Sequence, residues 1–187
     1  MSLDLAAGLP TLVGERIRLR ELGSADSAAL HAVFSDARVM AHWSHAPLRT
    51  MDDIAWYLRD IEAGRRHGTH YQWGIALRAP DATIGTLTLF SFDRQRRRAE
   101  VGYALARAYW GLGYAGEALR VALPFAFGAL RLDTIEARVD PANVASLRLL
   151  VAAGFHDDGD DAVSPAGAEH GPRRRLSINK DNYIFNN

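Results

Sequence analysis

The chain has 187 residues, and 48% of them are hydrophobic, which is enough apolar material for one domain with a substantial core. Its 22 basic and 22 acidic residues balance to a formal net charge of zero, so overall charge draws it neither to nucleic acid nor to a membrane surface. The absence of cysteine excludes disulfides, thiolate metal ligands and a cysteine nucleophile.

The ends and the apolar stretches carry no targeting signal. Residues 1–10 lack the basic and apolar regions of a signal peptide. The long apolar stretch 121–130 contains Pro124 and Gly128 and is too short to span a membrane. We therefore expect a cytoplasmic protein that folds as a single domain over residues 1–187, with residues 1–12 as a loosely ordered extension.

Alternating apolar and polar residues predict the strands, because this is the period of a half-buried sheet. The clearest example is near the start, where Ile17 and Leu19 alternate with three arginines. A turn signal around Pro80 joins two neighbouring strands as a hairpin. Turn-forming residues predict loops at 157–161 and 164–172. The predicted strands, in chain order, are 15–21, 71–77, 83–90, 99–106, 133–139 and 174–180.

Apolar residues spaced three or four apart predict the helices. Thr50 and the aspartates that follow it form an N-cap. Pro124 is expected to bend its helix or to mark its last turn, and Gly154 is a C-cap. The predicted helices are 24–36, 50–64, 115–127 and 143–154. This order of elements predicts an α/β fold in which helices pack against a mixed sheet.

The most informative stretch is Glu100 to Glu117, which predicts a strand, a glycine turn and the start of a helix. Unpaired N–H groups and the helix dipole at such a start form an anion site that suits a phosphate. Alternatively, the glycines only permit a tight turn. Gly111, Gly113 and Gly116 also have the spacing of a dinucleotide-binding turn, but the alternating strand–helix series of that fold is absent upstream.

Several short motifs match a known family pattern, namely residues 15–20, 43–47, 99–103, 110–115, 143–146 and 154–155. With them the chain resembles the GNAT-type N-acyltransferases over nearly its whole length, and within them the RimJ/RimL branch of ribosomal-protein N-terminal acetyltransferases. The resemblance implies a single domain with a mixed, mostly antiparallel sheet of about seven strands flanked by about four helices. It also implies acetyl-CoA as cosubstrate and no metal.

By this resemblance, the glycine turn holds the pyrophosphate of coenzyme A, and the end of the preceding strand pairs with the pantetheine arm. Such pairing needs unpaired backbone groups, which a bulge would supply. Asn143 is included as a cofactor contact, although asparagine is equally a favoured N-cap. The expected contacts are Tyr103, Ala104, Leu105, Gly111, Leu112, Gly113, Tyr114, Ala115, Gly116 and Asn143.

Two residues are the candidates for proton transfer. Glu100 is the candidate base, because deprotonating the attacking amine at pH 7 costs about 1 kcal/mol for an α-amino group and about 4 to 5 kcal/mol for a lysine. Alternatively, Glu100 only forms a salt bridge with Arg97 or Arg98. Leu150 stands where the family commonly places a tyrosine acid, and the resemblance gives Ser146 the task of protonating the leaving thiolate.

The acceptor side is less defined. By resemblance Trp43 and His45 line the acceptor pocket; alternatively they wedge the link between two helices. His42 and His45 could bind a metal only with a third ligand that is not in view. The arginines of 94–98 would attract an acidic peptide and the aspartates of 157–161 a polyamine, so charge does not decide the acceptor.

We therefore predict direct transfer of an acetyl group from acetyl-CoA to a primary amine, with a protein N-terminal α-amino group as the leading acceptor. One alternative is a small amine such as a polyamine or an aminoglycoside. Another is a catalytically silent acyl-CoA-binding sensor, which the missing tyrosine keeps open. Acetyl-CoA and the amine acceptor are the expected partners, without nucleic acid or membrane, and a homodimer is left open.

Overall fold

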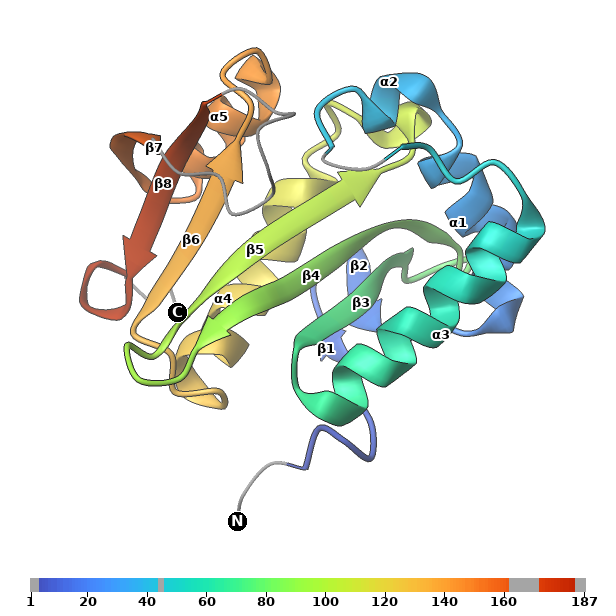
Figure 1. The fold of residues 1–187 in the computed structure, drawn as a ribbon, viewed down its shortest axis with the longest axis horizontal. Helices are drawn as coiled ribbons and strands as arrows, with labels where there is room; N and C mark the ends of the chain where they lie inside the picture. The colour runs from blue at the N-terminus through green and yellow to red at the C-terminus, as the bar shows by residue number, and fades with distance from the viewer. Residues whose placement is uncertain (1–3, 44–45, 162–171, 184–187) are drawn as a thin grey trace.

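The computed structural model describes residues 4–43, 46–161 and 172–183 (Figure 1). Within them the chain forms one eight-stranded sheet in the order β1-β2-β3-β4-β5-β6-β8-β7. Only β5 and β6 pair in parallel among the described strands. The strands are β1 (Leu12–Val13), β2 (Ile17–Arg20), β3 (His70–Leu77), β4 (Thr83–Asp93), β5 (Arg98–Leu105), β6 (Thr134–Val139), β7 (His156–Asp161) and β8 (Arg173–Asn179).

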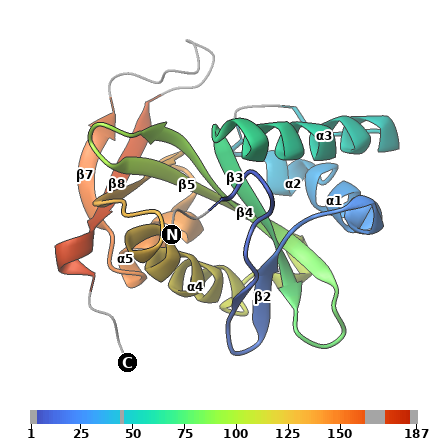
Figure 2. The same ribbon diagram turned by 90° about the horizontal axis from the view of Figure 1, so that it is seen from below.

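Helices cover both faces of the sheet. Figure 2 shows α4 and α5 on one side and α1, α2 and α3 on the other. The larger core cluster lies between the sheet and α4, and the smaller one lies under α1 to α3. The helices are α1 (Ser27–Phe34), α2 (Ala37–Met40), α3 (Met51–His67), α4 (Tyr114–Gly128) and α5 (Val144–Ala152), with short 3-10 turns at Ser24–Asp26, Arg107–Tyr109 and Lys180–Asn182.

The predicted strands and helices are all present, including the hairpin of β3 and β4. Pro124 lies inside α4, one turn before its end. The segment predicted as a loosely ordered N-terminal extension places Leu5 and Leu9 in the larger core cluster. Leu12 then pairs with Leu19 of β2. The described part of this segment is therefore packed against the domain.

Two of the differences from prediction have a clear physical reason. The acidic segment 157–161 is not a loop but strand β7, because its aspartates pair with arginines of β8, as in the Asp157–Arg174 pair at 2.7 Å. Helix α3 does not stop at Gly64 but continues to His67. Gly64 is buried under the ring of His70, and the helix ends at Gly68, whose φ of 67° is the left-handed conformation of a C-cap.

We expect Thr50→Ala to lower the free energy of unfolding by about 1 kcal/mol, because Thr50 caps α3. Its hydroxyl accepts the N–H of Asp53 at 3.1 Å, and the Asp53 carboxylate accepts the N–H of Thr50 at 2.8 Å. Urea unfolding followed by circular dichroism measures the change. Thr11→Ala, at an exposed position outside the strands and helices, is the control. An equal unfolding midpoint for the two variants would contradict the capping role.

The separation of β5 and β6 positions the site. Their pairing runs from Arg98 with Thr134 to Glu100 with Glu136 and then ends. Beyond Glu100 the two strands diverge, as Figure 1 shows, while β5 stays paired with β4 as far as Leu105. The sheet is therefore split between β5 and β6.

Candidate active site

A cavity of about 1420 Å³ lies at this split and reaches the elements on both faces of the sheet. Of the residues that the sequence singles out, it is lined by Trp43, Glu100, Tyr103, Ala104, Leu105, Gly111, Gly113, Tyr114, Ala115, Asn143 and Ser146. Leu112 and Gly116 are not among the lining residues. His45 lies outside the described residues.

The unpaired backbone of β5 arises from the divergence of β5 and β6, not from the bulge that the sequence suggested. From Val101 onward one edge of β5 has no strand partner within the described part of the chain. Ala106 donates its N–H to the Ile84 carbonyl of β4. Because successive residues of a strand direct their backbone groups to opposite edges, Leu105 and Tyr103 direct theirs to the open edge. The indole N–H of Trp110 donates a hydrogen bond to the Leu105 carbonyl at 2.8 Å. The open edge can pair with an extended ligand.

The glycine turn leads into the N-terminus of α4. Gly111 and Gly113 have φ values of 72° and 82°, a conformation that favours glycine. No side chain of the described residues caps this helix. Glu117 donates the first hydrogen bond of α4, to the Gly113 carbonyl, so the N–H groups of residues 114–116 have no helical partner. These are the unpaired N–H groups that the predicted anion site requires.

A buried carboxylate lies in the first turn of this helix and is neutralised. Glu117 is 4% exposed and pairs with Arg16 at 2.8 Å. Arg16 also donates to the Leu112 carbonyl at 3.0 Å and stacks over the ring of Tyr114, with 4.6 Å from its guanidinium carbon to the ring centroid. Arg16 therefore links β2 to the glycine turn and offsets a charge that would repel a phosphate.

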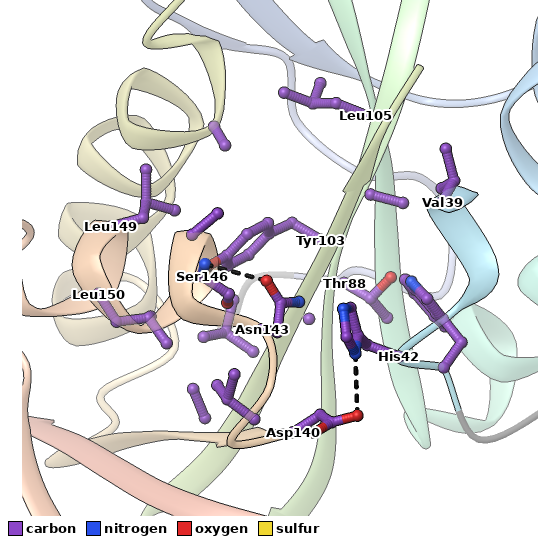
Figure 3. A pocket seen from close by; sticks show the side chains of 18 of the residues that line it. Val39, His42, Thr88, Tyr103, Leu105, Asp140, Asn143, Ser146, Leu149 and Leu150 are labelled. Atoms are coloured by element: carbon purple, nitrogen blue, oxygen red, sulfur yellow. Dashed lines mark hydrogen bonds and ion pairs between the residues drawn. The ribbon is translucent and has the colours of Figure 1, made fainter. Parts of the chain in front are cut away.

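Three polar side chains meet where α5 begins (Figure 3). The Asn143 side chain accepts the N–H of Ser146 at 3.1 Å and so caps α5. The Ser146 hydroxyl lies 2.8 Å from the phenol oxygen of Tyr103 on β5. Burial raises the pKa of Tyr103 to about 12, although the hydrogen bond with Ser146 opposes the rise. The phenol is neutral at physiological pH and can donate to Ser146.

Glu100 lies where β5 and β6 part, and its carboxylate is ion-paired. The partner is Arg138 on β6, and not Arg97 or Arg98, which pair with Asp133 and Glu136. Arg138 also pairs with Asp161 at 2.6 Å. The sequence analysis missed Arg138. The signal is present only once the register is known, because Arg138 lies two residues after the partner of Glu100 and shares its face of the sheet.

The acceptor side holds a second pair that the sequence analysis missed. His42 follows α2 and Asp140 follows β6, and Nδ1 of His42 lies 2.8 Å from Oδ2 of Asp140. No local signal links residues so far apart in the chain. Trp43 was predicted either to line a pocket or to wedge the link between two helices, and its position is compatible with both. It lines the cavity, and it also packs edge-on against Phe34 of α1, with 5.8 Å between the ring centroids.

Within residues 4–43, 46–161 and 172–183, no group of three or more histidine, aspartate or glutamate side chains could hold a metal ion. None of the described helices combines the length and the apolar character needed to cross a membrane.

A family model for the acetyltransferase (GNAT) domain matches residues 16–156. The uncharacterized N-acetyltransferase p20 of Bacillus licheniformis is 31% identical over 151 residues, which cover 81% of this chain and 85% of that protein. The chain belongs to the GNAT acetyltransferase family. It is an N-acetyltransferase, its fold is a single mixed α/β GNAT domain as predicted, and acetyl-CoA is the acetyl donor of the family.

Solved structures share the fold of this acetyltransferase. RimJ of Mycobacterium smegmatis in complex with CoA-disulfide superposes with a TM-score of 0.81 at 24% identity, covering 92% of this chain and 88% of RimJ. Spermidine N-acetyltransferase of Vibrio cholerae, in complex with CoA and spermine, has a TM-score of 0.76 at 20% identity, covering 89% and 97%. Because both kinds of enzyme share it, the fold does not decide the branch or the acceptor.

Proposed function

We propose that this acetyltransferase belongs to the RimJ/RimL branch and transfers the acetyl group of acetyl-CoA directly to the α-amino group of a peptide or protein N-terminus. The observation that carries the choice of acceptor is the charge pairing on the acceptor side of the cavity. Each of its carboxylates has a partner among the described residues: Arg138 offsets the charge of Glu100, and Asp140 and Asp60 lie against the imidazoles of His42 and His70. The cavity is also lined by more arginines than carboxylates.

This pairing favours an acceptor with little positive charge of its own. A polyamine carries several ammonium groups and binds best to free carboxylates. Arg38 and Arg173 add positive charge to the same cavity. An α-amino group has a pKa of about 7.7 to 8, so a large share of it is already neutral near pH 7 to 8. The arginines suit the carboxyl groups of a peptide.

The donor side fits coenzyme A. The open edge of β5 at Tyr103 and Leu105 can pair with the amide groups of the pantetheine arm. The N–H groups of residues 114–116 and the turn at Gly111 and Gly113 can hold the pyrophosphate. Leu112 and Gly116 do not line the cavity, so their proposed role is limited to the backbone of the turn and of the first turn of α4.

In the proposed reaction the amine nitrogen attacks the thioester carbonyl, the C–S bond breaks, and the leaving thiolate takes a proton. Ser146 is the proposed donor of that proton. The neutral Tyr103 phenol donates to the Ser146 oxygen at 2.8 Å, which leaves the serine hydrogen free to face the thiolate. Asn143 holds the backbone of Ser146 in place.

The test of the function is acetyl-CoA-dependent release of free thiol with a panel of acceptors. The panel contains a peptide with a free α-amino group, the same peptide N-terminally acetylated but with an internal lysine, spermine, and an aminoglycoside. We expect turnover with the free α-amino group alone. Preferred turnover of spermine would support the polyamine alternative, and binding of acetyl-CoA without turnover on any acceptor would support the silent sensor.

Ser146→Ala is expected to lower kcat roughly 100-fold, because general acid catalysis contributes at least about that factor. Tyr103→Phe is expected to cost less, because it removes only the group that orients Ser146. In the Ser146→Ala background, Tyr103→Phe should have no further effect. Initial rates of thiol release measure these changes. Tyr71→Phe, whose ring packs against Phe92 away from the cavity lining, is the control. Full activity of Ser146→Ala would remove the assignment.

A further inference from the structure

We propose that His42, oriented by Asp140, is the general base that takes the proton from the acceptor amine, an inference that rests on the proposed function. His42 projects from the turn after α2, and Asp140 follows the last residue of β6. Both side chains are about one-third exposed, at 32% and 31%, and both line the cavity. Figure 3 shows the imidazole with Asp140 on one side and its opposite edge directed into the cavity.

The ion pair assigns the imidazole tautomer. A carboxylate can only accept a hydrogen bond, so the 2.8 Å contact places a hydrogen on Nδ1 of His42. Nε2 then carries the lone pair that can accept a proton. Once the ring is protonated, the carboxylate of Asp140 stabilises the imidazolium. Asp140 is therefore a positioning residue, and His42 is the group that meets the substrate.

Hydrogen bonds from the turn after β6 and from β8 hold the pair in place. Oδ1 of Asp140 accepts the N–H of Ala142 at 2.9 Å, and the Asp140 carbonyl accepts the N–H of Asn143 at 2.8 Å. The His42 carbonyl accepts a hydrogen bond from Arg173 of β8 at 2.9 Å. The hydrogen bond from His42 and the N–H of Ala142 hold the pKa of Asp140 below its usual range. The carboxylate is thus ionised wherever the enzyme is assayed near neutral pH.

Glu100 is less suited to the same task. Protonation of Glu100 would break its ion pair with Arg138, whose side chain is only 20% exposed. The two types of side chain also differ in basicity. With the ordinary pKa values of the groups, the equilibrium constant for taking a proton from an α-ammonium group is unfavourable by roughly 30-fold for an imidazole and by roughly 5,000-fold for a glutamate. A base with a pKa near the working pH is the more effective one.

The proton balance of the step is complete. The ammonium group gives one proton to Nε2 of His42, and the neutral amine then forms the N–C bond to the thioester carbonyl. When the C–S bond breaks, Ser146 gives its proton to the thiolate, and the second amine proton leaves the product nitrogen and passes through solvent in the open cavity to Ser146, which restores the serine hydroxyl. The imidazolium releases its proton to solvent through the open cavity. The products are an amide, a free thiol and one proton.

Other charged groups of the cavity lie on the elements that surround His42. They are Arg38 on α2, the Asp60–His70 pair from α3 and β3, the Glu100–Arg138 pair on β5 and β6, Arg148 on α5, and Arg173 on β8. The charges of Glu100 and Arg138 offset one another, whereas the charge of Asp60 is offset only when His70 is protonated.

The test compares His42→Gln, Asp140→Asn and Glu100→Gln in the full chain, with a peptide acceptor that has a free α-amino group. Profiles of kcat/KM from pH 5.5 to 9.5 are measured, and calorimetry gives the Kd of acetyl-CoA. We expect His42→Gln to lose roughly 100-fold in kcat/KM at pH 7, with a deficit that shrinks above the pKa of the amine. Asp140→Asn should lose less and shift the acidic limb. Glu100→Gln breaks the ion pair with Arg138 and so can lower the rate at every pH, but it should leave the position of the acidic limb unchanged.

Two further arms separate chemistry from structure. Added imidazole should partly restore His42→Ala and should not restore Ser146→Ala. His156→Gln, on the exposed surface of β7 and outside the cavity lining, is the matched control. An unchanged acetyl-CoA Kd shows that the variants fold. If the wild type acetylates the peptide and His42→Gln stays within about three-fold of it at pH 7, the inference is overturned and the proposed function stands. Wild-type inactivity on every amine overturns the proposed function itself.

Discussion

Glu117→Gln is expected to lower the free energy of unfolding by about 2 kcal/mol, because it removes a buried carboxylate that accepts several hydrogen bonds, while its ion-pair partner Arg16 is 44% exposed. Glu117 Oε1 accepts the N–H groups of Arg16 and Ile17 at 2.7 and 3.2 Å, and Oε2 pairs with the Arg16 side chain at 2.8 Å. A glutamine oxygen satisfies part of this set, but its NH₂ group meets a donor instead of an acceptor. Urea unfolding measures the loss, with the exposed neighbour Glu15→Gln as control.

The pH dependence of stability provides a second measurement of the same contact. Burial would raise the pKa of Glu117, but the hydrogen bonds from Arg16 and Ile17 outweigh it, so the pKa lies below its usual value. The folded protein therefore binds this proton less readily than the unfolded chain. The contribution is present above the unfolded pKa of about 4.3 and is lost as the pH falls through the folded pKa. The difference between wild type and Glu117→Gln should shrink on acidification, and a difference that stays constant with pH would contradict this account.

Gly113→Val is expected to raise the Kd of acetyl-CoA by about 10-fold or more. The reason is that the left-handed backbone conformation costs about 1 to 2 kcal/mol for any residue other than glycine. Gly113 has a φ of 82°, and a β-carbon there would lie 3.3 Å from Nη2 of Arg16. Relief of this strain would turn the N–H groups at the start of α4 away from the phosphate. Isothermal titration calorimetry measures the affinity.

The matched control for Gly113→Val is Gly128→Ala at the other end of the same helix. A β-carbon at Gly128 meets open space, and its backbone is not left-handed. That variant should bind acetyl-CoA as the wild type does. If Gly113→Val also binds with wild-type affinity while circular dichroism shows it folded, the glycine turn does not hold the phosphates.

Most of the strands and helices could be predicted because their signals are local. The alternation around Ile17 and Leu19, and the cap at Thr50, act within a few residues of the chain. The aspartates of β7 could not be assigned in this way, because they take strand conformation only when arginines of β8 neutralise them. The continuation of α3 past Gly64 likewise depends on packing by His70.

For the site, the sequence by itself determined the glycine turn at Gly111 and Gly113 and the helix start that follows it, because left-handed glycines and a helix N-terminus need no distant partner. Only the tertiary structure decided what surrounds them. The open edge of β5 exists because β6 leaves it after Glu100. Tyr103 meets Ser146 across 43 positions of the chain, and His42 meets Asp140 across 98. A side-chain hydrogen bond needs atoms within about 3 Å, and only the folded sheet brings such distant residues that close.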